Sequence, residues 1–136
     1  MIGTIIITHG KLGEELLSVL EMITGKQENF ETVSITSVEK VDETVDMIKK
    51  KIKEVDCGKG VLLLTDMFGG TPSNISLSFL ESPDIEVVTG VNLPMLMKLV
   101  DSRDKMDLKE LANVITEYGK KSISVARNRL YSNKQE

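Results

Sequence analysis

The sequence predicts a single α/β domain: a mainly parallel sheet in a three-layer, doubly wound arrangement with helices on both faces. Short apolar runs typical of strands alternate along the chain with longer segments in which apolar residues recur every three or four positions. Strand and helix alternating in this way favour parallel strands joined by crossover helices. The 136 residues suit one domain with a sizeable core and contain no repeat or linker.

Four runs have the composition of strands. The first and third, Thr4–Thr8 and Gly60–Thr65, are dominated by the apolar stretches III and VLLL, which predicts central strands buried on both faces. The second, Phe30–Ile35, is polar at alternate positions and is expected nearer an edge. The fourth is Ile85–Thr89. Numbering the strands along the chain, we expect the order 2-1-3-4.

The segments between the strands have helical spacing. The first helix is expected to end near Gly25, and the second to cover 41–55. Thr71-Pro72 and Asn92-Leu93-Pro94 suit helix starts, because a capping residue is followed by proline in the first turn. Asp107–Glu110 resembles a capping box before a long C-terminal helix. The residues predicted to face the core are Leu12, Leu16, Val19, Leu20 and Ile23, then Val41, Val45, Ile48, Ile52 and Val55, and finally Leu108, Leu111, Ala112 and Ile115.

The C-terminal end has two interpretations. Ile123, Ala126 and Leu130 keep helical spacing, whereas Ser122–Val125 also suits a short edge strand. We expect one domain over residues 1–131, followed by a polar tail, Ser132–Glu136, that frays.

Composition limits the classes of function. A net charge of −4 argues against nucleic-acid binding, which needs a basic face. No apolar run approaches the roughly 20 residues of a membrane span, and no signal peptide precedes the first strand, so we expect a cytoplasmic protein without direct membrane insertion. With Cys57 and His9 as the only residues of their kinds, an internal disulfide and a cysteine-clustered zinc site are excluded. We expect no cofactor and no metal.

The candidate site lies where the predicted strand order reverses. In open α/β sheets, ligands bind beyond the carboxyl ends of the strands at this switch point, here between the first and third strands. The first strand ends in Thr8-His9-Gly10, and the third leads into TDMFGGTP at residues 65–72. The fold prediction therefore brings His9 and Asp66 into one crevice, although they are 57 positions apart.

These residue types together suit phosphoryl chemistry. A carboxylate that accepts one imidazole N–H fixes the tautomer, leaves the other nitrogen free to attack, and stabilises positive charge on the ring as a bond to phosphorus forms. Gly69-Gly70 before a helix start predicts an anion site, because glycine permits close backbone approach and first-turn N–H groups point at an anion. The hydroxyls of Thr71 and Ser73 can add hydrogen bonds to phosphoryl oxygens.

Each feature alone also has a structural explanation. A lone histidine at a strand end is commonly a polar residue without a catalytic role, Asp66 can cap the loop after its strand, and Gly-Gly-Thr-Pro is first a turn signature. Their joint placement at the predicted switch point favours a functional site.

Three motifs together resemble a known family. THG after the first strand, TDMFGGTPSN at 65–74 and TGVNLPML at 89–96 are similar to the mannose-family (mannose/fructose/sorbose) IIA domain of the bacterial phosphoenolpyruvate:sugar phosphotransferase system. The resemblance covers residues 2–127 in order and spacing. It implies a phosphotransferase that accepts a phosphoryl group from the phosphocarrier HPr on the strand-end histidine. The group then passes to a histidine of a IIB domain, for sugar uptake and phosphorylation.

Carried over to this chain, the resemblance implies that His9 is phosphorylated and that Asp66 is its hydrogen-bonding partner. It further implies a homodimer, a fifth, antiparallel edge strand and a free-standing IIA protein, because no linker to a IIB domain precedes the end at Glu136. The residues expected around the phosphoryl group are Gly69, Gly70, Thr71, Ser73 and Asn74, and those expected to dock HPr and IIB are Met67, Phe68, Asn92, Leu93 and Pro94.

Four alternatives remain beside this interpretation. Histidine phosphatases have a motif that resembles Arg-His-Gly and use a second histidine, whereas this chain has Thr8 before His9 and contains one histidine. Receiver domains have an acidic pair after the first strand, where this chain has Thr8-His9. Members of the family of the dihydroxyacetone kinase phosphocarrier subunit have a motif that resembles Ser-His-Ser after the first strand and lack the Gly-Gly-Thr-Pro loop. This family is the second-ranked interpretation. A regulatory IIA-like protein would use the same chemistry, so the sequence does not separate regulation from transport.

Overall fold

The computed structural model describes residues 1–36 and 40–131. Its centre is a four-stranded parallel sheet in the order β2-β1-β3-β4. The predicted strand order and the central position of the first and third strands are confirmed. The strands are β1 (Gly3–His9), β2 (Phe30–Ile35), β3 (Val61–Thr65) and β4 (Ile85–Thr89).

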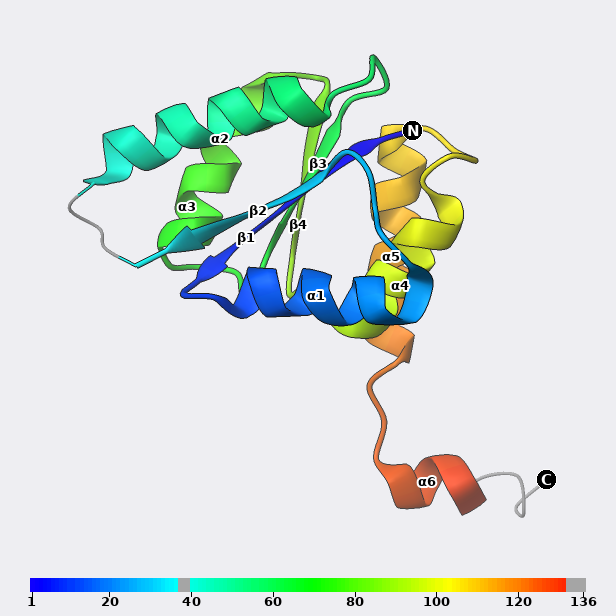
Figure 1. Cartoon of the computed structure of the whole chain (residues 1–136). Coiled ribbons are helices and arrows are strands. Elements are labelled where there is room, and N and C mark those ends of the chain that lie inside the picture. The colour runs from blue at the N-terminus through cyan, green and yellow to red at the C-terminus, as the bar shows by residue number, and fades with distance from the viewer. Residues whose placement is uncertain (37–39, 132–136) are drawn as a thin grey trace.

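Helices cover both faces of the sheet, which confirms the three-layer prediction (Figure 1). One layer contains α1 (Leu12–Thr24), α4 (Leu93–Ser102) and α5 (Leu108–Lys121). The other contains α2 (Val41–Val55) and α3 (Thr71–Leu77), which runs into the short 3-10 turn η2 (Ser78–Glu81). A final helix, α6 (Ala126–Tyr131), lies apart from the body.

The central strands send alternate side chains into two separate cores. Ile6 of β1 packs with Leu62 and Leu64 of β3 in the core under α1, α4 and α5. Ile5 and Ile7 belong to the core under α2 and α3. Because a strand directs successive side chains to opposite faces, burial of both faces explains why these two strands are apolar at nearly every position.

The predicted starts of α4 and α5 and the predicted end of α1 are found with their capping residues. The side chain of Asn92 accepts a hydrogen bond from the Met95 N–H at the start of α4, and Asp107 accepts one from the Glu110 N–H at the start of α5. Gly25 ends α1 with a φ of 88°, a left-handed conformation that favours glycine. Pro72 follows Thr71 at the start of α3, as expected, but Gly70 occupies the N-cap position and no side chain caps this helix, so the predicted capping role of Thr71 is wrong.

The buried face of α1 differs from the prediction. Leu12 and Ile23 are exposed, whereas Gly13 and Leu20 are buried. A Cβ on Gly13 would lie 3.2 Å from Cγ2 of Ile6, so the absence of a side chain lets the helix pack directly on β1 and turns its first apolar residue outward. Two further predicted core residues are also exposed, Val19 of α1 and Val41 in the first turn of α2.

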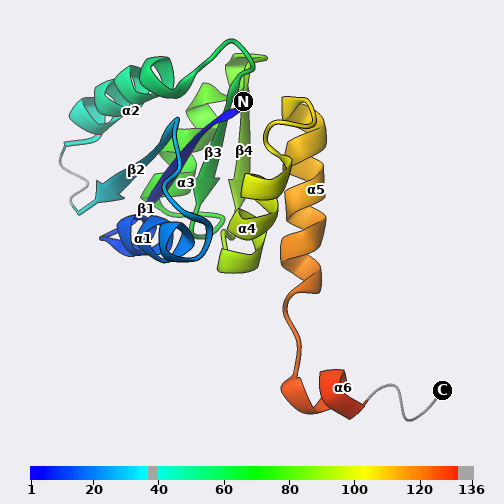
Figure 2. The same ribbon diagram turned by 45° about the vertical axis from the view of Figure 1, so that its right-hand side comes forward.

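The C-terminal segment leaves the body beyond α5. Residues 122–125 form no strand, and α6 follows them (Figures 1 and 2). The edge-strand interpretation of Ser122–Val125 is therefore wrong within this chain, because the segment leads away from the sheet edge that would pair with it. The helical interpretation holds over α6, and the tail Ser132–Glu136 lies outside the described residues.

A buried arginine closes the amino end of the sheet. Arg103 is 2% exposed, and its guanidinium donates hydrogen bonds to the carbonyl oxygens of Ile2, at 3.1 and 2.8 Å, and Asn29, at 2.9 Å. It also stacks over the ring of Phe30, with its central carbon 5.5 Å from the ring centroid. These contacts tie the end of α4 to the starts of β1 and β2 and leave the opposite end of the sheet for the candidate site.

Candidate functional site

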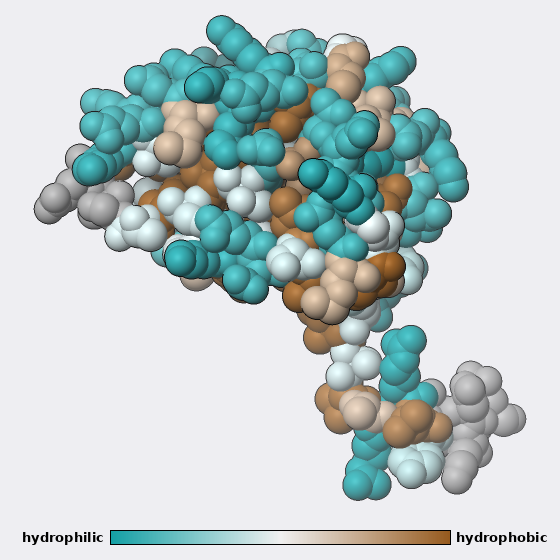
Figure 3. Space-filling view, in the orientation of Figure 1, coloured by the Kyte–Doolittle hydropathy of each residue, from teal (hydrophilic) through white to brown (hydrophobic). Residues whose placement is uncertain are grey.

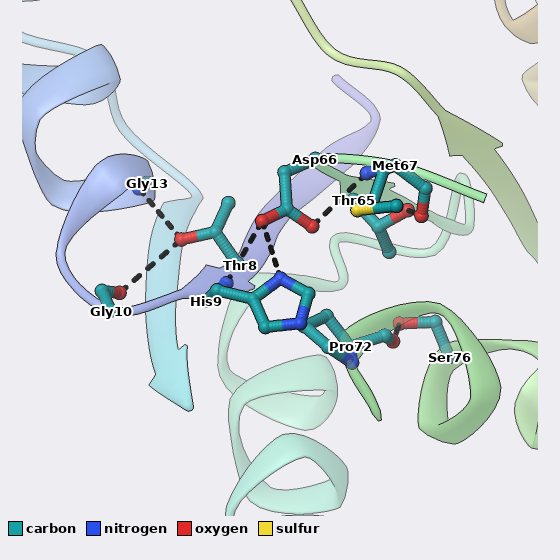
Figure 4. Close-up of polar contacts among 9 residues, drawn as sticks. All are labelled: Thr8, His9, Gly10, Gly13, Thr65, Asp66, Met67, Pro72 and Ser76. Atoms are coloured by element: carbon teal, nitrogen blue, oxygen red, sulfur yellow. Dashed lines mark hydrogen bonds and ion pairs between the residues drawn. The ribbon is translucent and has the colours of Figure 1, made fainter. Parts of the chain in front are cut away.

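His9 and Asp66 lie together at the carboxyl ends of β1 and β3. The register pairs Ile7 with Thr65, so the two chains leave the sheet side by side. The Nδ1 atom of His9 lies 2.8 Å from Oδ2 of Asp66, and the main-chain N–H of His9 donates to the same oxygen at 3.0 Å (Figure 4). The predicted proximity of these two residues is confirmed.

The carboxylate orients the imidazole. A carboxylate only accepts hydrogen bonds, so in the neutral imidazole Nδ1 carries the proton and Nε2 keeps its lone pair. The second oxygen of Asp66 accepts a hydrogen bond from the Met67 N–H at 3.0 Å, which fixes the carboxylate in turn. The His9 side chain is 50% exposed and the Asp66 side chain 12% exposed. The arrangement therefore presents an accessible nitrogen nucleophile on a nearly buried support.

The environment of Asp66 favours its ionised form. Partial burial raises the pKa of the carboxyl. The hydrogen bonds from the His9 ring and the His9 main chain, together with attraction to that ring, lower the pKa by a larger total amount. The pKa of Asp66 therefore lies below its ordinary value. An ionised Asp66 stabilises positive charge on the His9 ring, which develops when Nε2 forms a new bond.

Gly70 lies against the free edge of the imidazole. A Cβ at this position would come within 3.1 Å of Cε1 and 3.2 Å of Nε2 of His9. Gly70 also has a φ of 86°, and the neighbouring Gly69 has a nearly equal φ of 87° with no atom within 4 Å of a built Cβ. Of these two glycines, Gly70 is therefore the one that keeps space open beside Nε2.

The other residues predicted around a phosphoryl group differ in accessibility. Thr71 is partly buried and Asn74 is exposed. The N–H of Asn74 donates to the Gly70 carbonyl at 2.9 Å, within the first turn of α3. Ser73 is fully buried, and its hydroxyl has no hydrogen-bonding partner among the described residues. This burial weighs against direct contact of Ser73 with an anion beside His9.

The residues predicted to dock partners fall into two groups. Met67 and Phe68 follow Asp66 directly and are exposed, Phe68 to 75%. Leu93 and Pro94 are partly buried at the start of α4. The side chain of Asn92 caps α4 and donates to the Gly119 carbonyl of α5 at 3.2 Å, which gives it a structural task.

Thr8 is a residue at this site to which the sequence analysis assigned no task. Its buried hydroxyl contacts both sides of the turn that follows His9, with hydrogen bonds to Gly10 and Gly13 (Figure 4). A hydroxyl residue directly before a strand-end histidine, with a glycine five positions later, is the sequence signal that could have pointed to it.

Among residues 1–36 and 40–131, no group of three or more His, Cys, Asp or Glu side chains gathers to hold a metal ion. In the same ranges, no helix has the length and apolar character needed to cross a membrane.

Known proteins share this sequence and fold. A family model, EIIA-man, described as the PTS system fructose IIA component, matches residues 3–116. The chain is 32% identical over 128 residues to the mannose-specific EIIAB component of Escherichia coli K12, covering 93% of this chain and 40% of that protein. It is 31% identical over 131 residues to the fructose-specific EIIA component of Bacillus subtilis, covering 96% of this chain and 90% of that protein.

Solved structures agree with the sequence relatives. The phosphotransferase system component EIIA from Streptococcus agalactiae superimposes with a TM-score of 0.85 at 30% identity, covering 94% of this chain and 99% of that chain. The PTS IIA protein associated with the fucose utilization operon of Streptococcus pneumoniae gives a TM-score of 0.82 at 31% identity, covering 94% and 95%. With the family model matching most of its length, the chain belongs to the mannose/fructose IIA family of the phosphotransferase system.

Proposed function

We propose that this protein is a phosphoryl carrier of the sugar phosphotransferase system. It accepts a phosphoryl group from phospho-HPr on His9 and passes it to a IIB component for sugar uptake and phosphorylation. The observation that carries the proposal is the accessible His9 ring, with Nδ1 held 2.8 Å from Asp66 and Nε2 free beside Gly70. Family membership supports the phosphotransferase class.

The first transfer uses the free nitrogen. The lone pair of Nε2 attacks the phosphorus carried by the donor histidine, and the P–N bond to the donor breaks as its electron pair returns to the donor ring. The new Nε2–P bond leaves positive charge on the His9 ring. Because Nδ1–H is hydrogen-bonded to an ionised Asp66, that charge forms beside a fixed negative group that needs no rearrangement.

In the second transfer, His9 is the donor of the phosphoryl group. A histidine of the IIB component attacks the same phosphorus, the Nε2–P bond breaks, and the pair of electrons returns to His9. Transfer between histidines exchanges one P–N bond for another, so alignment of donor, phosphorus and acceptor is the main requirement. Both partners must reach His9 in turn, as its half-exposed ring allows.

The surface around His9 suits transient docking. Met67 and Phe68 expose apolar side chains directly after Asp66, and such exposed residues favour contact with another protein. Gly69, Thr71 and Asn74 lie on the same loop and helix start as Gly70, and we assign them to the surroundings of the phosphoryl group. With HPr and IIB as partners, the site of action is the cytoplasm.

We also propose a homodimer. The arm, residues 123–131, carries exposed apolar side chains away from the body, including Ile123, which is 77% exposed, together with Val125 and Leu130 (Figure 3). Apolar side chains on a projecting segment cost free energy in water unless another surface covers them. A second copy of the chain is the occupant that we assign.

Phosphorylation of His9 is tested with phosphoenolpyruvate, enzyme I and HPr. We expect one phosphoryl group per chain, acid-labile and base-stable, on Nε2 of His9 as assigned by NMR. His9→Ala should abolish labelling because the chain has no other histidine. Adding a IIB component should then discharge the phosphorylated protein. Labelling that persists in His9→Ala would contradict the proposal.

Asp66→Asn should slow phosphoryl transfer while preserving the fold, because the ring loses a charged partner.

The effect of Asp66 on stability has a defined sign. A pKa that is lower in the folded than in the unfolded chain stabilises the fold above the ordinary pKa of about 4, and this contribution is lost as the pH falls through the lowered value. The difference in unfolding free energy between the protein and Asp66→Asn should therefore shrink between pH 7 and acidic pH in urea titrations. The control Asp84→Asn, at an exposed position, should change neither the transfer rate nor the free energy of unfolding. An unchanged transfer rate in Asp66→Asn would limit Asp66 to a structural role.

The space beside Nε2 is tested by two alanine substitutions. Gly70→Ala and Gly69→Ala both place a side chain at a positive φ, 86° and 87°, which favours glycine. Only Gly70→Ala places a methyl group against Nε2. We expect phosphoryl transfer to be at least about 10-fold slower in Gly70→Ala than in Gly69→Ala, since small misplacements at a reacting centre carry costs of this order. Equal rates, with equal stability in urea, would contradict this assignment of Gly70.

The dimer is tested by sedimentation of the full chain. We expect the mass of two chains, and the mass of one chain when Ile123 and Val125 are both replaced by glutamate. Ser124→Glu adds charge to the same exposed arm without removing an apolar side chain, so it should remain dimeric. A monomeric unmodified protein would refute the proposed assembly.

A further inference from the structure

The hydroxyl of Thr8 bridges the turn that follows His9. Thr8 is fully buried between β1 and α1. Its Oγ1 accepts a hydrogen bond from the Gly13 N–H at 2.8 Å and donates one to the Gly10 carbonyl at 3.3 Å (Figure 4). A single hydroxyl thus joins the residue after His9 to the second residue of α1, and it uses both its acceptor and its donor capacity.

This contact replaces the usual cap of α1. Lys11, at the N-cap position, offers no side-chain cap, so one of the unsatisfied N–H groups of the first helical turn is bound by Thr8 instead. A Cβ on Gly13 would lie 3.2 Å from Oγ1 of Thr8, which shows how closely the helix start approaches the strand. The turn between β1 and α1 is therefore held at both ends by one buried side chain.

His9 depends on this turn for its position. Its ring is half exposed, and among the described residues the ring has one hydrogen-bonding partner, Asp66. The main chain of residue 9 must therefore supply the rest of the alignment. On one side Gly10 donates its N–H to the Ile35 carbonyl at 3.0 Å, and on the other Thr8 fixes the path into α1.

We propose that Thr8 is a positioning residue for phosphoryl transfer. Its hydroxyl holds the His9-Gly10 turn so that Nδ1 meets Asp66 and Nε2 faces the incoming phosphorus. Thr8 touches neither the phosphoryl group nor a partner, and it acts through the backbone of His9. The inference rests on the proposed carrier function for its kinetic consequence, but its geometric consequence concerns the free protein.

Matched substitutions isolate the hydroxyl. Thr8→Val keeps the shape of the side chain and removes the hydroxyl. Thr8→Ala and Thr8→Ser both remove the methyl group and differ only in the hydroxyl, so this pair serves if the valine variant does not fold. Thr4→Val is the control on the same strand, because Thr4 is equally buried and its hydroxyl has no partner among the described residues. Urea titrations report the stability of each variant.

Two readouts separate positioning from a purely structural role. We expect single-turnover transfer from phospho-HPr to fall about 10-fold or more in Thr8→Val and Thr8→Ala, and to stay close to the unmodified rate in Thr8→Ser and Thr4→Val. In the free protein, the ¹⁵N and ¹H signals of the His9 ring should show a weakened Nδ1–H hydrogen bond in Thr8→Val and Thr8→Ala only.

Equal transfer rates in Thr8→Ala and Thr8→Ser would overturn the inference, and so would slower transfer with unchanged His9 ring signals. A loss of stability without either change would show that Thr8 only caps α1. The ring signals are recorded without HPr, so they decide the positioning role even if the protein proves not to accept phosphate from HPr. Failure of the unmodified protein to be labelled would instead refute the proposed function.

Discussion

The parallel pairing of β1 with β3 is the constraint on which the rest of the structure depends. Both strands are buried on both faces, and a shift of one residue would exchange the side chains of the two cores. The pairing of Ile7 with Thr65 is therefore strongly fixed. Because the strands are parallel and in this register, the chain brings His9 and Asp66 to one edge of the sheet, from positions 57 residues apart.

The two ends of the sheet are finished in different ways. At the amino end, the buried Arg103 satisfies main-chain carbonyls and closes the structure. At the carboxyl end, Asp66 is held by main-chain and ring N–H groups, while the ring of His9 stays half exposed. One end thus closes the structure, and the other presents the accessible ring of His9, which an ionised Asp66 orients. Buried contacts set the backbone beneath that group, so it keeps its orientation without being enclosed.

Exposed apolar side chains lie close in sequence to both His9 and Asp66. Leu12 lies three residues after His9, and Met67 and Phe68 directly follow Asp66; all three are exposed. The exposure of Leu12 follows from Gly13, because close packing of α1 on β1 at this glycine turns the preceding side chain outward. The arm, which lies apart from the body in Figure 2, carries further exposed apolar side chains.

The fold class, the strand order, the caps of α4 and α5 and the proximity of His9 and Asp66 could all be predicted from the sequence. These follow from local patterns, since burial on two faces produces apolar strands, caps need particular side chains, and parallel strands end at the same edge. Other features became clear from the three-dimensional structure: which ring nitrogen is free, that Gly70 and not Gly69 borders it, that Ser73 is buried, and that Thr8 bonds across the turn. Periodicity did not reveal how α1 is rotated on the sheet or where residues 122–125 lead. Each of these depends on distances between atoms far apart in the chain, which no local pattern encodes.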